Sequence, residues 1–273
     1  MSLAILPDGN IVYPVRNMHR IQIVTPDGKL VREFGKFGDK AGQLDLPTAV
    51  TTDKEGRIYV TESGNNRVQV FSSKGKSLAV LAPTGEDALK QPFGVAVDPA
   101  GRIWVGDNGN NRLVALKADG TVAATVGAAG KGPGEFQRIG HLSVVSGRLF
   151  VADRDNRRIQ VFDPRNISAA PEIVPMAQGT EPCAVGYDGK GTYVVSMWRG
   201  VATFDKNWRP LGSYAGDAAG ELWPYQSVFD GDGNIVIGDW WGKRILIVSP
   251  QLTSVKPEAV SYTHLTLPTT PYV

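Results

Sequence analysis

The amino-acid sequence predicts an all-β fold, a six-bladed β-propeller made of four-stranded antiparallel blades. The first observation behind this prediction is a pattern that recurs about every 46 residues, a period typical of propeller blades. The second is a succession of short β-branched and aromatic runs, each followed by a glycine-containing turn. The third is that no segment shows sustained helical periodicity. We therefore expect one continuous ring of blades rather than two separate domains.

The repeated pattern is an acidic residue at the end of one strand, a polar turn, and an arginine at the start of the next strand. Successive arginines are 47, 45 and 46 residues apart, followed by a gap of 86 residues that spans two units. A weaker first copy has Arg20 without the acid, and the fifth copy has Gly200 in place of the arginine. The repeated acids and arginines are Glu62, Arg67, Asp107, Arg112, Asp153, Arg158, Asp239 and Arg244.

Residues that recur in successive units are expected to serve the blade, whereas residues that occur once can serve a ligand. The repeated carboxylates can accept hydrogen bonds from turn amides, and the repeated arginines can pair with them. We therefore interpret these positions as structural rather than as a calcium or catalytic cluster. Asp230–Asn234 resembles a calcium loop, but this segment lacks the following glutamate and falls where every unit has a hairpin.

Each unit begins with a short apolar strand nearest the axis, and a glycine turn joins it to a second, β-branched strand. The expected first strands are residues 3–5, 49–51, 94–97, 142–145, 184–187 and 227–229. The expected second strands are residues 11–13, 58–60, 103–105, 149–151, 193–195 and 235–237. The acid-to-arginine turn leads to a third strand, and a further turn leads to a fourth. One domain at 1–256 then holds blades at approximately 2–46, 47–91, 92–138, 139–181, 182–223 and 224–256.

The connectors between units carry a repeat of their own, in Gly38–Leu44, Gly130–Phe136 and Gly216–Leu222. Glycine-rich connector, first strand, glycine turn, second strand, acid-to-arginine turn and third strand together resemble the NHL repeat family. The resemblance covers residues 2 to about 256, and it is degraded in the first and fifth units. It implies a propeller that most often serves as a non-catalytic binding platform.

The segment 260–269 does not follow the repeat and resembles a translated sequencing adapter. We therefore expect residues 257–273 to be a non-native tail. Because residues 260–267 alternate in polarity, this segment could still be drawn in as a strand at the edge of the sixth blade.

Bulk composition excludes several classes of function. A net charge of +2 does not favour binding to nucleic acid or to an anionic membrane. Cys183, the single cysteine, excludes an internal disulfide and a cysteine-based zinc cluster. No apolar run approaches the roughly 20 residues of a membrane helix, and no signal peptide is visible. We expect a soluble protein whose compartment is open, extracytoplasmic if the N-terminus is incomplete.

The residues that occur once point to one face of the ring. In an antiparallel blade, the connectors and the acid-to-arginine turns lie on one face and the glycine hairpins lie on the other. Five of the six tryptophans fall in units five and six, and four of these belong to the connector side. They can pack between blades or form an aromatic platform for a ligand. The candidate ligand-binding residues at this channel mouth are Trp198, Arg199, Trp223, Tyr225, Trp240, Trp241, Arg154 and His141.

Neither a catalytic set nor a metal site is discernible in the sequence. His141 begins the first strand of unit four, where the other units have Thr48, Phe93, Cys183 and Gln226. His19 is the only other histidine before the tail, and two histidines leave a third zinc ligand unassigned. We therefore predict no catalytic residue, no metal site and no cofactor, with a divalent cation in the channel only if the protein is an enzyme.

Three classes of function compete. The first is a non-catalytic platform for a protein, peptide or glycan, working as a monomer without membrane contact. The second is an enzyme, because the resemblance extends by fold to sugar-lactone hydrolases with a channel metal and to a peptide-amidating lyase with histidine-bound zinc. The third is RNA binding, known for NHL propellers attached to tripartite-motif regions, which calls for a broad basic face. We rank them in this order.

Overall fold

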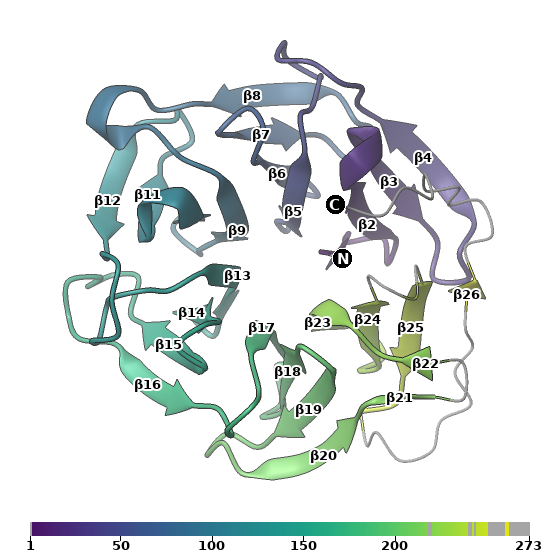
Figure 1. Ribbon diagram of the computed structural model, residues 1–273. Coiled ribbons are helices and arrows are strands. Elements are labelled where there is room, and N and C mark those ends of the chain that lie inside the picture. Colours follow the sequence, from purple (N-terminus) through teal and green to yellow (C-terminus); the bar gives the residue numbers. More distant parts are fainter. Residues whose placement is uncertain (1, 218–219, 240–241, 243, 251–259, 262–273) are drawn as a thin grey trace, which may run out of the picture.

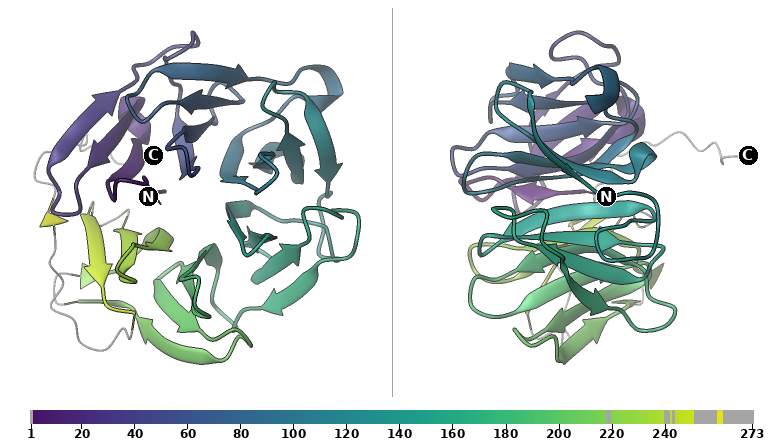
Figure 2. Two further views of the ribbon diagram at one scale, coloured as in Figure 1. Left: turned by 180° about the vertical axis from the view of Figure 1, so that it is seen from behind. Right: turned by 90° about the vertical axis from the view of Figure 1, so that its left-hand side faces the viewer.

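The computed structural model describes residues 2–217, 220–239, 242, 244–250 and 260–261. Six four-stranded antiparallel sheets are arranged in a ring, which confirms the predicted six-bladed propeller (Figure 1). Each sheet runs in chain order from its first strand near the axis to its fourth strand at the rim. Viewed edge-on, the ring is a thick disc with loops on both faces (Figure 2).

The first three blades each occupy one continuous stretch of chain. Blade 1 contains β1 (Ala4–Ile5), β2 (Ile11–Val15), β3 (Arg20–Val24) and β4 (Leu30–Phe34). Blade 2 contains β5 (Pro47–Thr52), β6 (Ile58–Glu62), β7 (Arg67–Phe71) and β8 (Ser77–Leu81). Blade 3 contains β9 (Pro92–Val97), β10 (Ile103–Asp107), β11 (Arg112–Leu116) and β12 (Val122–Val126). Short 3₁₀ turns lie between strands at η1 (Arg16–Met18), η2 (Gly85–Asp87) and η3 (Asn108–Asn110).

The last three blades repeat this plan. Blade 4 contains β13 (Ile139–Val145), β14 (Arg148–Asp153), β15 (Arg158–Phe162) and β16 (Glu172–Pro175). Blade 5 contains β17 (Pro182–Tyr187), β18 (Tyr193–Met197), β19 (Gly200–Phe204) and β20 (Pro210–Tyr214). Blade 6 contains β23 (Pro224–Phe229), β24 (Ile235–Asp239), β25 (Arg244–Val248) and β26 (Val260–Ser261). A two-stranded ribbon, β21 (Gly216–Asp217) and β22 (Gly220–Glu221), lies in the connector between blades 5 and 6.

Burial explains the composition of the strands. All residues of β2, β6, β10 and β24 are buried, because each of these second strands has a neighbouring blade on both faces. Their sequences are accordingly continuous apolar runs rather than alternating ones. The outer strands β8 and β12 alternate between exposed and partly buried residues, since one of their faces meets solvent.

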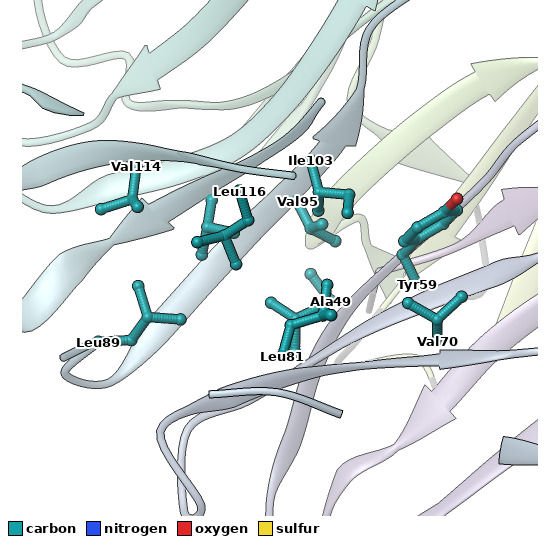
Figure 3. Packing of buried hydrophobic residues seen from close by; sticks show 11 residues of the cluster. Ala49, Tyr59, Val70, Leu81, Leu89, Val95, Ile103, Val114 and Leu116 are labelled. Atoms are coloured by element: carbon teal, nitrogen blue, oxygen red, sulfur yellow. The ribbon is translucent and has the colours of Figure 1, made fainter. Parts of the chain in front are cut away.

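The hydrophobic core is divided into clusters that lie between adjacent blades. Between blades 2 and 3, for example, Tyr59 and Leu81 pack against Val95 and Ile103 (Figure 3). Ring closure uses the same kind of packing. Blade 1 is joined to blade 6 by a buried apolar cluster that contains Leu3, Ile11, Tyr13, Val15, Val24, Val236 and Ile245. Among the described residues, apolar clusters therefore continue around the ring and include the junction of the two ends.

The fourth strand of blade 6 comes from the segment that resembles an adapter. Val260 pairs with Ile245, and Ser261 pairs with Arg244, in antiparallel register. This pairing agrees with the expectation that an alternating segment is drawn to the open edge of blade 6. The remainder of 257–273 lies outside the described residues.

Candidate functional site

Four buried acid–arginine pairs fasten the connectors to the blades. In blade 3, Asp107 accepts a hydrogen bond from the Lys90 backbone N–H at 2.6 Å, from Asn110 Nδ2 at 2.8 Å and from Arg112 Nε at 2.7 Å. The Arg112 guanidinium also donates to the Ala88 carbonyl of the connector at 3.1 Å. The corresponding pairs are Glu62 with Arg67, Asp153 with Arg158, and Asp239 with Arg244, with Nε–oxygen distances of 2.7, 2.8 and 2.9 Å.

These contacts have two consequences for the site. Each carboxylate is fully buried and occupied by groups of the chain itself, which is the geometry of a structural position. The hydrogen bonds also hold the connectors and the acid-to-arginine turns together on one face of the ring. We call this side the connector face, and we call the side that carries the first glycine turn of each blade the hairpin face.

A bulge at the start of the inner strand recurs in blades 2 to 6. The pairing register of the inner and second strands shifts by one residue just after Pro47, Pro92, Ile139, Pro182 and Pro224. A bulge leaves its extra residue outside the ladder and can redirect a side chain. The residues within these bulges include Thr48, Phe93, His141, Cys183 and Tyr225.

Three of these bulge residues meet at the centre of the ring and form what we call the axial cluster: Phe93, His141 and Tyr225. The ring centroids of Phe93 and His141 are 5.1 Å apart, and those of His141 and Tyr225 are 6.4 Å apart. His141 is 3% exposed, whereas Phe93 and Tyr225 are half-buried. Burial, together with the positive charge of Arg154, lowers the pKa of His141 to about 3, so its imidazole is neutral at physiological pH.

Arg154 joins the axial cluster to the tryptophans of the connector face. Its guanidinium carbon lies 5.4 Å from the Tyr225 ring centroid and 5.7 Å from that of Trp198. The side chain passes Gly140, where an added Cβ atom would lie 3.2 Å from Arg154 Cδ and 2.8 Å from the Cys183 carbonyl oxygen. Glycine at this position therefore allows the arginine stem to run along the inner strand of blade 4.

Trp198 and Trp223 continue this surface toward solvent. The two rings are arranged edge-to-face with centroids 4.8 Å apart, and the Arg199 guanidinium carbon lies 5.7 Å from the Trp223 ring. Trp198 is 38% exposed and Trp223 is half-buried. We call Trp198, Trp223, Tyr225, Arg154 and Arg199 the aromatic–arginine cluster. Such stacks of guanidinium groups and rings combine dispersion with cation–π attraction.

The structure thus brings together six of the eight residues predicted at the channel mouth. Trp240 and Trp241 lie outside the described residues. Two of these six residues are buried instead of exposed at the channel mouth: Arg154 is 5% exposed and His141 is 3% exposed. Phe93 belongs beside them, although its sequence position predicted only the start of a strand. Its position directly after Pro92, equivalent to that of Tyr225 after Pro224, is the signal that could have identified it.

The described residues contain no group of three or more His, Cys, Asp or Glu side chains suited to a metal ion. His19 lies in the turn before β3, where its Nδ1 accepts a hydrogen bond from the Leu46 N–H at 3.2 Å and its ring packs edge-on against Phe37. His141 instead packs against Phe93 at the axis. The two histidines therefore have separate surroundings. Cys183 is buried and free, and burial raises the pKa of its thiol.

A groove on the hairpin face was not predicted. It has a volume of about 410 Å³ and lies between the hairpins of blades 3 and 4. Its three arginines are each paired with a carboxylate, at 2.7 Å for Arg102, 2.9 Å for Arg148 and 2.8 Å for Arg165. Because its charges are already balanced within the chain, this groove is a weaker candidate than the aromatic–arginine cluster.

Comparisons with known proteins identify the same repeat in this chain. The NHL repeat model matches residues 44–71 and 89–116, which lie in blades 2 and 3. The E3 ubiquitin-protein ligase TRIM71 of Rattus norvegicus is 48% identical over 48 residues, which cover 18% of this chain and 6% of that protein. Protein lin-41 of Caenorhabditis elegans is 39% identical over 46 residues, covering 17% of this chain and 4% of that protein. The match therefore spans only a small part of these relatives.

Solved structures share the architecture of the whole ring. A streptogramin B lyase superposes with a TM-score of 0.69 at 17% identity, covering 92% of this chain and 80% of that chain. A chain of a nidogen/laminin complex superposes with a TM-score of 0.62 at 19% identity, covering 79% of this chain and 80% of that chain. At these identities the similarity establishes the fold alone. The chain is a six-bladed β-propeller in which residues 44–71 and 89–116 match the NHL repeat.

Proposed function

We propose that this propeller is a non-catalytic platform that binds a protein, peptide or glycan ligand on its connector face. The observation that carries the proposal is the aromatic–arginine cluster, in which the exposed ring of Trp198 continues through Trp223 and Arg154 to the axis. Rings and guanidinium groups together offer a stacking surface and directed hydrogen-bond donors. Peptides and glycans present the complementary apolar faces and polar acceptors.

The contrast with Trp208 supports this reading of Trp198. Trp208, in the outer hairpin of blade 5, stacks on Tyr193 with ring centroids 4.6 Å apart and planes 7° apart. It also packs against Phe150 and Phe204, so its ring completes the core between blades 4 and 5. Trp198 has no comparable enclosure, since more than a third of its surface is exposed. Burying exposed apolar surface under a ligand is favourable by about 25 cal/mol per Å².

Propellers that resemble this one also occur in assemblies, as the nidogen/laminin complex illustrates. Loops from all blades converge at the mouth of the ring, which makes this face a common place for ligands on such scaffolds. RNA binding is the third-ranked alternative, and a net charge of +2 gives it little support.

The proposal is tested by screening the chain against peptide and glycan arrays and repeating the screen with Trp198→Ala and Trp223→Ala combined. We expect ligands whose affinity falls at least tenfold in this variant while the melting temperature stays within a few degrees. Leu211→Ala, which removes an exposed apolar side chain from the outer strand of blade 5, is the control and should retain the ligands. Ligands that survive the loss of both rings, or an array without ligands, would contradict the proposal.

A propeller hydrolase or lyase is the second candidate, and one observation favours it. His141 is a buried, neutral imidazole at the axis beside Arg154, where its ring nitrogen can hydrogen-bond a bound substrate and Arg154 can stabilise negative charge. The streptogramin B lyase with the same fold suggests one substrate to assay, and sugar lactones suggest another. Turnover that is lost in His141→Gln at unchanged melting temperature would place the enzyme first. A divalent cation becomes relevant only if that turnover requires it.

A further inference from the structure

Two side chains at the axis keep hydrogen-bond donors without a partner. Arg154 Nε, Arg154 Nη2 and His141 Nε2 are buried and have no hydrogen-bond partner among the described residues. Buried polar atoms in folded proteins are paired in the large majority of cases, because an unpaired one is unfavourable. Three such atoms in two neighbouring side chains therefore call for an explanation by function.

The two unpartnered nitrogens of Arg154 lie on one edge of its guanidinium. Nε and Nη2 together form the fork that binds both oxygens of a carboxylate in parallel. The repeat arginines satisfy this edge within the chain: Arg158 donates from Nε to Asp153 at 2.8 Å and from Nη2 to the Gly132 and Glu135 carbonyls at 2.7 and 2.9 Å. The carboxylate that approaches Arg154 is that of Glu181, but its Oε2 lies 3.7 Å from Nη2 and instead pairs with Arg138 at 2.7 Å.

Comparison of the blades shows that Arg154 does not serve the repeat. It follows the repeated acid directly, a place that Ser63 occupies in blade 2 and Asn108 in blade 3. Ser63 Oγ donates to the Leu46 carbonyl at 3.2 Å, and Asn108 Oδ1 accepts from the Ile139 N–H at 3.0 Å, so both secure their local backbone. Arg154 makes no equivalent side-chain bond among the described residues, and its Nε and Nη2 are buried without a hydrogen-bond partner there.

The surroundings of the fork suit an acid with an apolar group. Tyr225 contacts both Arg154, at 5.4 Å, and His141, at 6.4 Å, so the donors of the two side chains flank one ring. Trp198 covers the guanidinium and is the exposed neighbour. A ligand that reaches the fork must therefore displace or slide along the Trp198 ring. A buried fork beside one exposed ring favours the end of a chain or a small molecule over the middle of a polymer.

We propose that Arg154 and His141 bind the terminal carboxylate of a ligand whose apolar part rests on Trp198 and Trp223. Arg154 donates to both oxygens through Nε and Nη2, and His141 donates to one of them through its Nε2–H. This inference rests on the proposed platform and narrows its ligands to carboxylic acids with an aromatic or aliphatic group next to the acid. Two sources share that chemistry, the C-terminus of a peptide and a free carboxylic acid.

Matched acids and amides test the pocket on the unmodified chain. The peptide pair is acetyl-Gly-Gly-Phe with a free C-terminus and the same peptide with a C-terminal amide; the small-molecule pair is phenylacetate and phenylacetamide. Tryptophan fluorescence reports binding, since Trp198 covers the fork. We expect the acid to bind at least tenfold more tightly than its amide. The pair with the larger difference in affinity shows whether the carboxylate comes from a peptide C-terminus or from a free carboxylic acid. Equal affinity of acid and amide overturns the carboxylate pocket.

Two variants locate the effect. Arg154→Gln should abolish the preference for acid over amide, and Arg16→Gln, at the same repeat position in blade 1, should retain it. The assignment of Arg154 to the carboxylate is overturned if Arg154→Gln still prefers the acid over its amide. It is also overturned if neither the peptide acid nor phenylacetate binds the unmodified chain. These outcomes are separate from the array screen of the platform, in which amides and neutral glycans remain acceptable ligands. Tighter binding of phenyl phosphate than of phenylacetate would also overturn the carboxylate assignment.

Discussion

Phe93 of blade 3 and Tyr225 of blade 6 meet across the axis of the propeller, with ring centroids 6.2 Å apart. These two blades lie opposite each other in a ring of six (Figure 1), so the contact spans the centre. His141 of blade 4 joins them and completes the axial cluster. The axis therefore has an aromatic floor that contains a neutral imidazole, next to the guanidinium of Arg154.

The acid–arginine pair of blade 3 should contribute strongly to stability. Asp107→Ala removes the acceptor of three hydrogen bonds and leaves the Arg112 guanidinium without its carboxylate. Removing one partner of a buried ion pair typically costs 3–5 kcal/mol. Because Arg112 is partly exposed, we expect a loss of about 3 kcal/mol in the free energy of unfolding, measured by urea denaturation.

The control for this pair lies on the surface. Asp163→Ala breaks the exposed ion pair between Asp163 and Arg165, and exposed pairs contribute little. Its denaturation midpoint should stay close to that of the unmodified chain. If Asp107→Ala were as mild as Asp163→Ala and instead removed a metal-dependent activity, the acid would be catalytic rather than structural.

Gly94 should be irreplaceable in the inner strand of blade 3. An added Cβ atom would lie 2.5 Å from the Gly140 carbonyl oxygen and 2.9 Å from the Leu142 nitrogen, both in the backbone of blade 4. Backbone atoms cannot move aside as a flexible side chain can, so Gly94→Ala must separate the two inner strands. Overpacking of this kind costs typically 1–3 kcal/mol. Thermal melting should show a clear decrease in stability.

Gly231→Ala provides the matched comparison. A Cβ atom there would meet nothing within 4 Å, and its backbone does not have the left-handed conformation. Alanine at such a site changes stability by well under 1 kcal/mol or raises it slightly, by restricting the unfolded chain. Equal melting temperatures for the two variants would mean that the inner strands are not in close contact.

The fold could be predicted from sequence because its determinants are local and repeated. Glycine turns, β-branched strands and the recurring acid and arginine each identify one strand or turn, and six copies fix the number of blades. The placement of Trp198, Trp223 and Tyr225 on one face follows from strand direction in the same way. Even blade 5, without the acid and the arginine, keeps its four strands, because its apolar pattern is intact.

Burial at the axis could not be predicted from the repeat. The depth of His141 and Arg154 depends on which side chains arrive from the other blades, such as Phe93 and Tyr225. These contacts join residues more than 45 positions apart, and the repeat predicts only that Phe93, His141 and Tyr225 share a position at the strand start, not how their side chains pack. Space beside Gly140 decides where the Arg154 stem runs, and this too is a tertiary property. The sequence therefore predicts which face carries the candidate residues and which residue types they are. It does not predict that one edge of the Arg154 guanidinium lacks hydrogen-bond partners among the described residues.

The tail should contribute little to stability. Deleting residues 257–273 removes the two-residue pairing of Val260–Ser261 with β25 and leaves the other strands of blade 6 in place. Each net hydrogen bond contributes about 0.5–1.5 kcal/mol, and an edge strand of two residues makes few. We expect the free energy of unfolding to fall by about 1–2 kcal/mol or less in urea denaturation. Complete loss of folding would show that the tail belongs to the domain.

His141 should make the stability of the propeller depend on pH. Its pKa is about 3 in the folded chain and about 6.5 when the chain is unfolded, so the unfolded state binds the proton more readily. The stability contributed by the neutral buried imidazole is fully present above pH 6.5 and is lost as the pH falls toward 3. Between pH 7.5 and pH 5, we expect this group alone to lower the free energy of unfolding by about 2 kcal/mol.

Urea denaturation of the unmodified chain and of His141→Gln at both pH values isolates this contribution. Glutamine does not titrate, so the variant should lose about 2 kcal/mol less than the unmodified chain over the same interval. Cys183→Ser changes the neighbouring bulge residue without removing a group that titrates in this range, because burial raises the pKa of the thiol. It should therefore keep the full pH dependence. Parallel curves for the unmodified chain and His141→Gln would mean that the imidazole gains a proton, or a partner, inside the folded ring.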